Sequence, residues 1–299
     1  MPNVVLVLQN YHSALKNIIG ARQKITHNPP LYINSNYSKR IQKSHKTFSM
    51  RYIIFLILTS LIHYNGFSQD YYKRTKISND IELIKLSENA YVHVSYSELP
   101  NFGRFPSNGL IFINGSEAFL FDTPATDSLT LDLVSWIRDS LKLKIVGFVP
   151  NHWHNDCIGG LGYLKNQKIE SYANQMTIDI AKANNFPVPA NGFKDSLQLQ
   201  LGDKVIKCYY FGAAHSFDNI VVWIPSEQIL FPGCMIKSIN SKDLGNIVDG
   251  DLIAYPKTID KLMERFPTSK IVIPGHGPFG GYELIKHTKE LTTTSRPTL

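Results

Sequence analysis

The chain has 299 residues, of which 43% are hydrophobic and 18% are charged, a composition that allows a globular protein with a substantial core. Its formal net charge is +7, but residues 1–49 contain seven Lys or Arg and no acidic residue. Removing those seven from the 31 basic residues leaves 24, which equals the number of acidic residues. The charge balance beyond residue 49 therefore gives no reason to expect a nucleic-acid-binding protein.

Residues 50–69 have the pattern of a secretory signal peptide. A short basic start at residues 50–52 leads into an apolar run from Ile53 to Ile62, and the small residues Gly66 and Ser68 follow. The run is shorter than the roughly 20 apolar residues of a membrane-spanning helix, and the polar segments on both sides disfavour a buried core helix. We therefore expect residues 1–49 to be a non-native or disordered leader and residues 50–69 to be a signal peptide that starts at Met50. The mature protein then begins near residue 69 or 70 and is periplasmic, without a stable membrane anchor.

From residue 70 onward, the hydrophobic pattern changes repeatedly between strand and helix. Alternating or apolar runs bounded by Asn, Gly and Pro predict strands at Ile81–Leu86, Tyr91–Ser95, Leu110–Ile113, Ala118–Phe121, Ile145–Val149, Leu197–Leu201, Ile206–Phe211, Ile220–Ile224, Ile229–Phe231 and Ile271–Ile273. Helical spacing predicts helices at Ser128–Leu141, Leu161–Asn166, Met176–Ala183, Ile259–Phe266 and Tyr282–Leu291. Strands followed by helices occur twice without a linker, which predicts one α/β domain over residues 70–299, with two sheets between helical layers.

The clearest chemical motif directly follows the predicted strand Ile145–Val149. It places His152, His154 and Asp156 at alternate positions of a predicted loop, where two imidazoles and a carboxylate can face a common centre. Imidazole and carboxylate groups are zinc ligands. Two histidines alone would be read as solvated loop residues, and the carboxylate is what favours a metal site.

Three further candidate ligands lie in loops after predicted strands. His215, Cys234 and His276 are each bordered by Gly or Pro, or by small residues. Taken singly, each is equally well read as a satisfied buried histidine or an inert buried cysteine. Loops at one edge of a sandwich converge, however, and such loops commonly carry function. The shared placement therefore predicts that these side chains join the first motif.

The chain has three cysteines, an odd number that allows one disulfide at most. A disulfide framework is therefore not expected, and a thiolate metal ligand is a better use for at least one of them. Cys208 lies inside a predicted strand and is expected to be a small buried hydrophobic residue.

With these motifs in view, the sequence resembles the metallo-β-lactamases, the zinc-dependent class B enzymes, and within them the first subclass. The matching segments are NHWHNDCIGGLGYL (151–164), GAAHSFDNIVVWIP (212–225), LFPGCMIKS (230–238), LGNIVDGD (244–251) and IPGHG (273–277). The resemblance runs from about residue 77 to about residue 290 and implies a four-layer αβ/βα sandwich. It also implies two Zn²⁺ per chain, the first held by His152, His154 and His215, and the second by Asp156, Cys234 and His276.

The resemblance further implies an activity. Members of this family hydrolyse the amide bond of β-lactam antibiotics (penicillins, cephalosporins and carbapenems) by a metal-bound hydroxide, and so confer antibiotic resistance. Asp156 would orient that hydroxide. The expected partner is a small-molecule β-lactam, with no nucleic acid, and the expected state is a monomer.

Four residues match positions that contact substrate in the family. Lys237 would pair with the carboxylate of the antibiotic, or is a solvated lysine. Asn246 would help to hold the carbonyl oxygen, or is a turn asparagine. Phe102 and Phe105 resemble the flap that closes over substrate, or fold onto the core as hairpin residues.

Three residues close to the motifs have open roles. Asp122 and Asp249 are candidates to orient ligand imidazoles, and each is equally well read as a cap or turn residue. Cys157 follows Asp156 directly, where many relatives have Arg or Ser, and we interpret it as a non-ligand near the site.

Two other functions share this fold. The first is another hydrolase of this fold, a thioesterase or a lactonase. Glyoxalase-type thioesterases and nucleases of the superfamily usually have a His after the Asp of the first motif and a carboxylate that bridges the metals. Cys157 and Cys234 stand at those places here, which disfavours them. A non-catalytic zinc-binding protein would have no need of Lys237 or of the flap.

Overall fold

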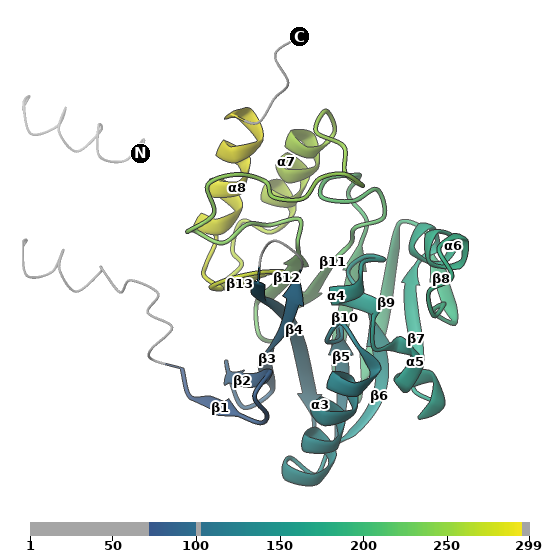
Figure 1. Ribbon diagram of the computed structural model, residues 1–299. Helices are drawn as coiled ribbons and strands as arrows, with labels where there is room; N and C mark the ends of the chain where they lie inside the picture. Colours follow the sequence, from purple (N-terminus) through teal and green to yellow (C-terminus); the bar gives the residue numbers. More distant parts are fainter. Residues whose placement is uncertain (1–71, 100–102, 295–299) are drawn as a thin grey trace, which may run out of the picture. The chain divides into compact units, whose positions relative to one another are not determined.

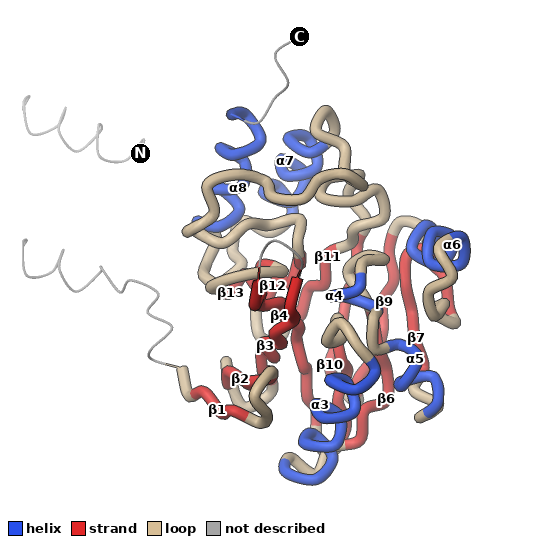
Figure 2. Tube along the Cα trace, viewed as in Figure 1, coloured by secondary structure: helices blue, strands red, loops and turns tan. Residues whose placement is uncertain are grey.

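The computed structural model describes residues 72–99 and 103–294, which form two β-sheets with helices on their outer faces (Figure 1 and Figure 2). The first sheet contains eight strands: β1 (Arg74–Lys76), β2 (Ile81–Lys85), β3 (Ala90–Leu99), β4 (Gly103–Asn114), β5 (Glu117–Phe121), β6 (Lys144–Val149), β7 (Glu170–Asn174) and β8 (Asn191–Phe193). The second contains five: β9 (Ser196–Leu201), β10 (Lys204–Tyr209), β11 (Val221–Ile224), β12 (Ile229–Gly233) and β13 (Ile271–Pro274). The helices are α3 (Asp127–Ser140), α4 (Asn155–Ile158), α5 (Leu161–Asn166), α6 (Gln175–Ala183), α7 (Tyr255–Arg265) and α8 (Glu283–Thr294). The leader and signal peptide predicted for residues 1–69 lie outside the described residues.

In each sheet, a run of antiparallel strands is followed by a helical crossover to a parallel strand, and in the first sheet β7 and β8 continue the parallel part. Strands β1 to β5 pair antiparallel in chain order, and α3 then leads to β6, which is parallel to β5. Strands β9 to β12 repeat this, and α7 leads to β13, parallel to β12. A parallel pair needs such a crossover because its strands run in the same direction.

Alternation along the strands creates three separate cores. In β4, Leu110 and Phe112 pack between the two sheets, whereas Ile111 and Ile113 pack against the layer that contains α3 and α5. A third core lies between the second sheet and helices α7 and α8, and includes Val221 of β11. Successive side chains of a strand point to opposite faces, so a sheet covered on both sides is apolar at nearly every position. Three cores between four layers confirm the predicted αβ/βα sandwich.

Apart from shifts of one to three residues at the ends of elements, the strands and helices differ from the predictions in four respects. Strands β3 and β4 extend well beyond the predicted core segments, because their outer ends form a hairpin with polar residues. The short elements β1, α4, β7 and β8 were not predicted, as their few residues carry no readable periodicity. Helix α7 begins at Tyr255 rather than at Ile259, with Pro256 in its first turn, where proline is favoured. Asp156 lies on α4 and not on a loop.

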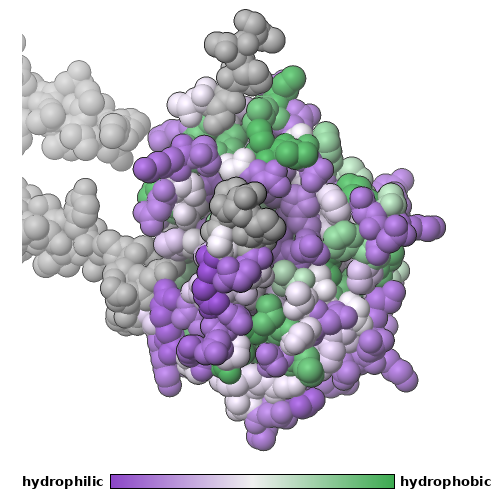
Figure 3. Space-filling model, in the orientation of Figure 1, coloured by the Kyte–Doolittle hydropathy of each residue, from purple (hydrophilic) through white to green (hydrophobic). Residues whose placement is uncertain are grey.

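Hydrophobic residues form small separate patches on the face shown in Figure 3, with hydrophilic residues between them. Across residues 72–99 and 103–294, no helix has both the length and the apolar character that crossing a membrane requires.

Candidate metal centre

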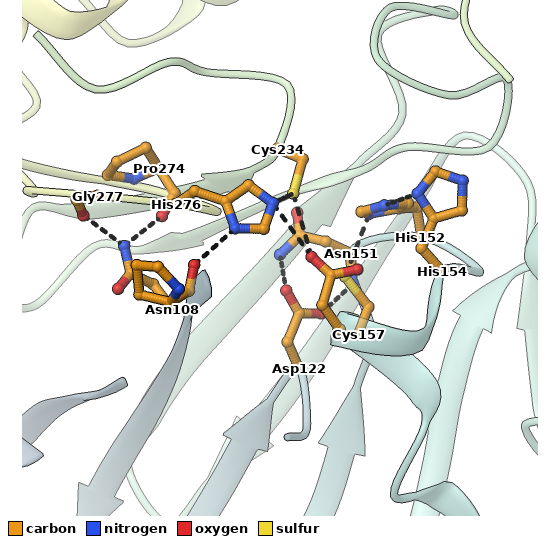
Figure 4. Close-up of polar contacts among 12 residues, drawn as sticks. Asn108, Asp122, Asn151, His152, His154, Cys157, Cys234, Pro274, His276 and Gly277 are labelled. Carbon is orange, nitrogen blue, oxygen red and sulfur yellow. Dashed lines mark hydrogen bonds and ion pairs between the residues drawn. The ribbon is translucent and has the colours of Figure 1, made fainter. Parts of the chain in front are cut away.

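The four motifs meet where the connections between strands come together, and Figure 4 shows residues of three of them, those of His152, Cys234 and His276. His152 and His154 follow β6, and Asp156 lies in the first turn of α4. Cys234 and His276 follow β12 and β13, and His215 lies in the connection between β10 and β11. The structure thus brings together residues that are far apart in the sequence, as the shared placement of their loops predicted.

The end of β5 holds the loop that carries the first histidines. Asp122 follows β5 with a φ of 55°, a left-handed conformation that costs energy for a residue with a side chain. In that conformation its carboxylate accepts hydrogen bonds from the backbone N of Asn151 at 2.6 Å and from Nδ2 of Asn151 at 3.3 Å. Asp122 thus fixes the backbone directly before His152. These two bonds join the carboxylate to Asn151 and not to an imidazole.

Three imidazoles lie next to one another on one side of the centre. Nε2 of His152 is 2.9 Å from Nδ1 of His154. The ring of His215 is 4.9 Å from that of His152 and 5.3 Å from that of His154. Burial, and secondarily the neighbouring cationic groups, hold the pKa of His152 and that of His215 well below the ordinary value. Both rings are therefore neutral near pH 7, which is the form that binds metal ions.

The other side of the centre contains a thiol, a carboxylate and an imidazole. Sγ of Cys234 lies 3.2 Å from Nε2 of His276 and 3.6 Å from Oδ2 of Asp156. The same Oδ2 lies 3.3 Å from Nε2 of His276. Gly275 permits this approach, since a Cβ atom there would come within 2.2 Å of the Cys234 sulfur. A sulfur, a carboxylate oxygen and an imidazole nitrogen thus face one point.

Further contacts orient two of these imidazoles. Nε2 of His154 donates to Oδ2 of Asp249 at 2.8 Å, which is the contact expected of a residue that orients an imidazole. Nδ1 of His276 donates to the carbonyl oxygen of Pro106 at 2.9 Å. Asn108, which sequence analysis missed, secures the His276 loop by donating to the carbonyls of Pro274 and Gly277, each at 2.8 Å.

These donors fit zinc. Nitrogen, carboxylate oxygen and sulfur are its usual ligands. Ligand atoms of Asp156, Cys234 and His276 lie within 4.8 Å of one another, as do those of His152, His215 and Cys234. Burial, and then the Asp156 carboxylate, raise the pKa of the Cys234 thiol. Because a bound cation would offset both effects and favour the thiolate, the cluster has the electrostatics of a cation site.

The structure describes three of the four residues predicted to contact substrate, which are Lys237, Phe105 and Asn246. Lys237 is partly buried, and its backbone N donates to Oγ1 of Thr288 at 2.8 Å. Burial lowers the pKa of Lys237, while the charges of Cys234 and Asp156 act in the opposite direction. The ring of Phe105 lies 4.8 Å from the ring of His276. Phe102 lies outside the described residues.

Asn246 is exposed, and its Oδ1 accepts from the backbone N of Val248 at 3.2 Å. This is the contact of a turn asparagine. The side-chain NH₂ group is a donor that this contact does not use.

An αβ/βα sandwich with a cluster of His, Asp and Cys donors at the ends of its strands defines a class, the metal-dependent hydrolases of this fold. Comparison with known proteins narrows the class. No protein-family model matches the chain. A metallo-β-lactamase type 2 from Bacteroides fragilis is 49% identical over 249 residues, which are 82% of this chain and 99% of the relative. Another from Bacillus cereus is 34% identical over 71% of this chain and 82% of the relative.

Solved structures agree with these relatives. The crystal structure of VMB-1 at pH 5.5 superposes with a TM-score of 0.70 and 38% identity, over 73% of this chain and 99% of that one. The metallo-β-lactamase from Pontibacter korlensis gives a TM-score of 0.70 and 34% identity, over 72% of this chain and all of the other. The chain belongs to the metallo-β-lactamase family, as its motifs predicted, and is a zinc-dependent β-lactam hydrolase.

Proposed function

We propose that this chain opens the amide bond of β-lactam antibiotics with two zinc ions, and so confers resistance to them. The observation that carries the proposal is the convergence of donors from four separate segments. The first ion would be held by His152, His154 and His215, and the second by Asp156, Cys234 and His276. The two sets differ in charge, because the first is three neutral imidazoles and the second includes two groups that are anionic when ligated.

Zinc ions supply two things when bound: they lower the pKa of water so that hydroxide is available near neutral pH, and they polarise a carbonyl group. The protein's own part is to position the reactants. The carboxylate of Asp156, 3.3 Å from Nε2 of His276 and 3.6 Å from Sγ of Cys234, would accept a hydrogen bond from the attacking water and orient it. Asp249 and Pro106 hold the rings of His154 and His276 so that the geometry of the centre does not change.

The side chains around the centre would hold the antibiotic. The ammonium of Lys237 pairs with the carboxylate of the substrate as a point charge with three donors. The free NH₂ group of Asn246 donates to the carbonyl oxygen of the lactam. Phe105, together with Phe102, offers apolar surface to the substituents of the substrate.

Hydrolysis of a penicillin, a cephalosporin and a carbapenem by the purified chain tests this function. Absorbance should fall as each lactam ring opens, a chelator should abolish the change, and added Zn²⁺ should restore it. A thioester and a lactone serve as comparison substrates. Turnover of either one without turnover of any β-lactam would contradict the proposal, and so would an absence of all turnover in zinc.

We also propose that the chain is exported to the periplasm by the signal peptide that starts at Met50, and that the mature domain is a monomer. N-terminal sequencing of exported protein tests the first point, with a start near residue 69 or 70 expected. Analytical ultracentrifugation tests the second.

A further inference from the structure

The candidate ligand histidines differ in what holds the ring nitrogen that faces away from the metal centre. For His154 the partner is the carboxylate of Asp249, and for His276 it is the carbonyl of Pro106. Oxygen acceptors of these two kinds are the usual partners of a metal-binding imidazole. His152 departs from this pattern, because its Nδ1 lies 3.2 Å from the sulfur of Cys157.

Cys157 lies on α4 in a completely enclosed position. Its exposed fraction is 1%, that of His152 is 0% and that of Asp122 is 2%, so water does not compete for their hydrogen bonds. The carboxylate of Asp122 is close enough to the thiol for the two groups to interact electrostatically. Asp122 is itself fixed by the backbone N of Asn151 at 2.6 Å. An imidazole, a thiol and a carboxylate therefore follow one another from the metal centre to the end of β5.

We propose that Cys157 is a positioning residue for His152: its sulfur accepts the Nδ1–H of His152, and its S–H donates to the carboxylate of Asp122. A thiol can act in both ways, as a weak donor and a weak acceptor. With the proton held on Nδ1, the lone pair of Nε2 is free, and Nε2 is the atom that faces Nδ1 of His154 at 2.9 Å. This inference rests on the proposed function, in which His152 binds zinc.

The geometry separates this role from that of a metal ligand. Donor atoms of Cys157, His152 and Asp156 do lie within 4.8 Å of one another. The sulfur, however, contacts Nδ1 of His152, whereas Nε2 of the same ring faces His154. A metal ion bound at Nε2 and shared with His154 lies on the opposite edge of the ring from Cys157.

The test measures the tautomer of His152 in the metal-free chain. Two-bond ¹⁵N–¹H NMR correlations of histidine-labelled protein distinguish Nδ1–H from Nε2–H. We expect a single Nδ1–H form in the wild type, a mixture in Cys157→Ala, and recovery in Cys157→Ser, whose hydroxyl can also donate and accept. Cys208→Ala is the matched control, because it removes a fully buried thiol from the core between the sheets. If Cys157→Ala fails to fold, Cys157→Val fills the volume without the hydrogen bonds.

A second readout is the affinity for the first Co²⁺ ion, measured by competition with a chelating dye. Loss of an orienting partner should weaken it about 10- to 100-fold in Cys157→Ala, and Cys157→Ser should restore most of it. An unchanged tautomer together with unchanged affinity would overturn the inference. So would loss of a thiolate-to-Co²⁺ absorption band in Cys157→Ala, since Cys157 would then be a ligand. Failure of the wild type to bind Co²⁺ would instead contradict the proposed function, and the metal-free tautomer remains measurable in that case.

Discussion

Nε2 of His154 donates to Oδ2 of Asp249 over 2.8 Å, although the two residues are 95 positions apart in the chain. The bond ties the loop after β6 to the loop before α7, and these loops lie on different sheets. A carboxylate can only accept a hydrogen bond, so it fixes the proton of His154 on Nε2 and leaves Nδ1 free for a metal ion.

Replacing Asp249 should therefore weaken metal binding without unfolding the protein. We expect Asp249→Ala to lower the affinity for the first Zn²⁺ about 10- to 100-fold, and Asp249→Asn, whose amide oxygen still accepts, to lower it less. Competition with a zinc-binding dye measures the affinity. Asp132→Ala, an exposed substitution on α3, is the control and should leave it unchanged. Equal affinities in Asp249→Ala and the control would show that the bond has no orienting effect.

Cys234 should determine how many metal ions the chain holds. Its sulfur lies 3.2 Å from Nε2 of His276, and a hydroxyl is a much poorer zinc ligand than a thiolate. We expect Cys234→Ser to bind one tightly held zinc ion rather than two, as measured by metal analysis after equilibrium dialysis. Cys208→Ser should keep two, because Cys208 is buried in β10 away from the donors. A stoichiometry of two in Cys234→Ser would contradict its assignment as a ligand.

Lys237 should contribute to binding of substrate and much less to the chemical step. Its ammonium would attract the carboxylate of the antibiotic, so Lys237→Ala should raise KM about tenfold with a smaller change in kcat, the pattern of lost ground-state binding. Lys237→Arg should retain part of the effect. The exposed Lys242 offers a control for general charge loss. An identical rise in KM for a neutral ester of the same antibiotic would show that the carboxylate is not the partner.

Much of the fold could be predicted because strands covered on both faces leave a clear apolar signal. Leu110 to Ile113 are all buried, although alternate residues belong to different cores. Strand β8 could not be predicted in this way, since its residues Asn191 and Gly192 are exposed at the edge of the sheet. The predicted strands also stop short of the outer ends of β3 and β4, because the first residues of β4 are exposed and carry no apolar signal.

The candidate site also contains residues that could be predicted from the sequence and residues that could not. Its His, Asp and Cys side chains could be predicted as metal ligands because each of them lies in a short motif at the end of a strand. The residues that hold those motifs could not, because their bonds join distant segments. Asn108 donates to the carbonyl of Pro274, 166 positions away, and nothing in the local sequence of Asn108 indicates this. Asn151, in contrast, directly precedes His152 and could have been noticed.

His93 gives a prediction for the pH dependence of stability. It lies on β3 opposite Gly109, whose missing side chain leaves room for the buried ring. Burial lowers the pKa of His93 to about 4, despite the opposing effect of the backbone carbonyls of Asp122 and Phe121. Its Nδ1 has no hydrogen-bond partner among the described residues, so a second proton would be buried without an acceptor. The folded protein therefore keeps this ring neutral at pH values where the unfolded chain protonates it.

The sign follows from which state binds the proton. Between the unfolded pKa of about 6.5 and the folded pKa of about 4, the unfolded chain binds more protons, so stability falls as the pH is lowered. The difference in pKa corresponds to about 3 kcal/mol, of which roughly three quarters is lost between pH 6.5 and pH 4 and the rest just outside this range. Denaturant unfolding of the metal-free chain at several pH values measures it, since metal release then makes no contribution. His93→Gln keeps a donor toward the Asp122 carbonyl but does not titrate. Its stability should therefore fall less than that of the wild type over this pH range, and the difference between the two losses should equal the contribution of His93. Parallel pH profiles for the wild type and His93→Gln would mean that His93 is protonated equally in both states.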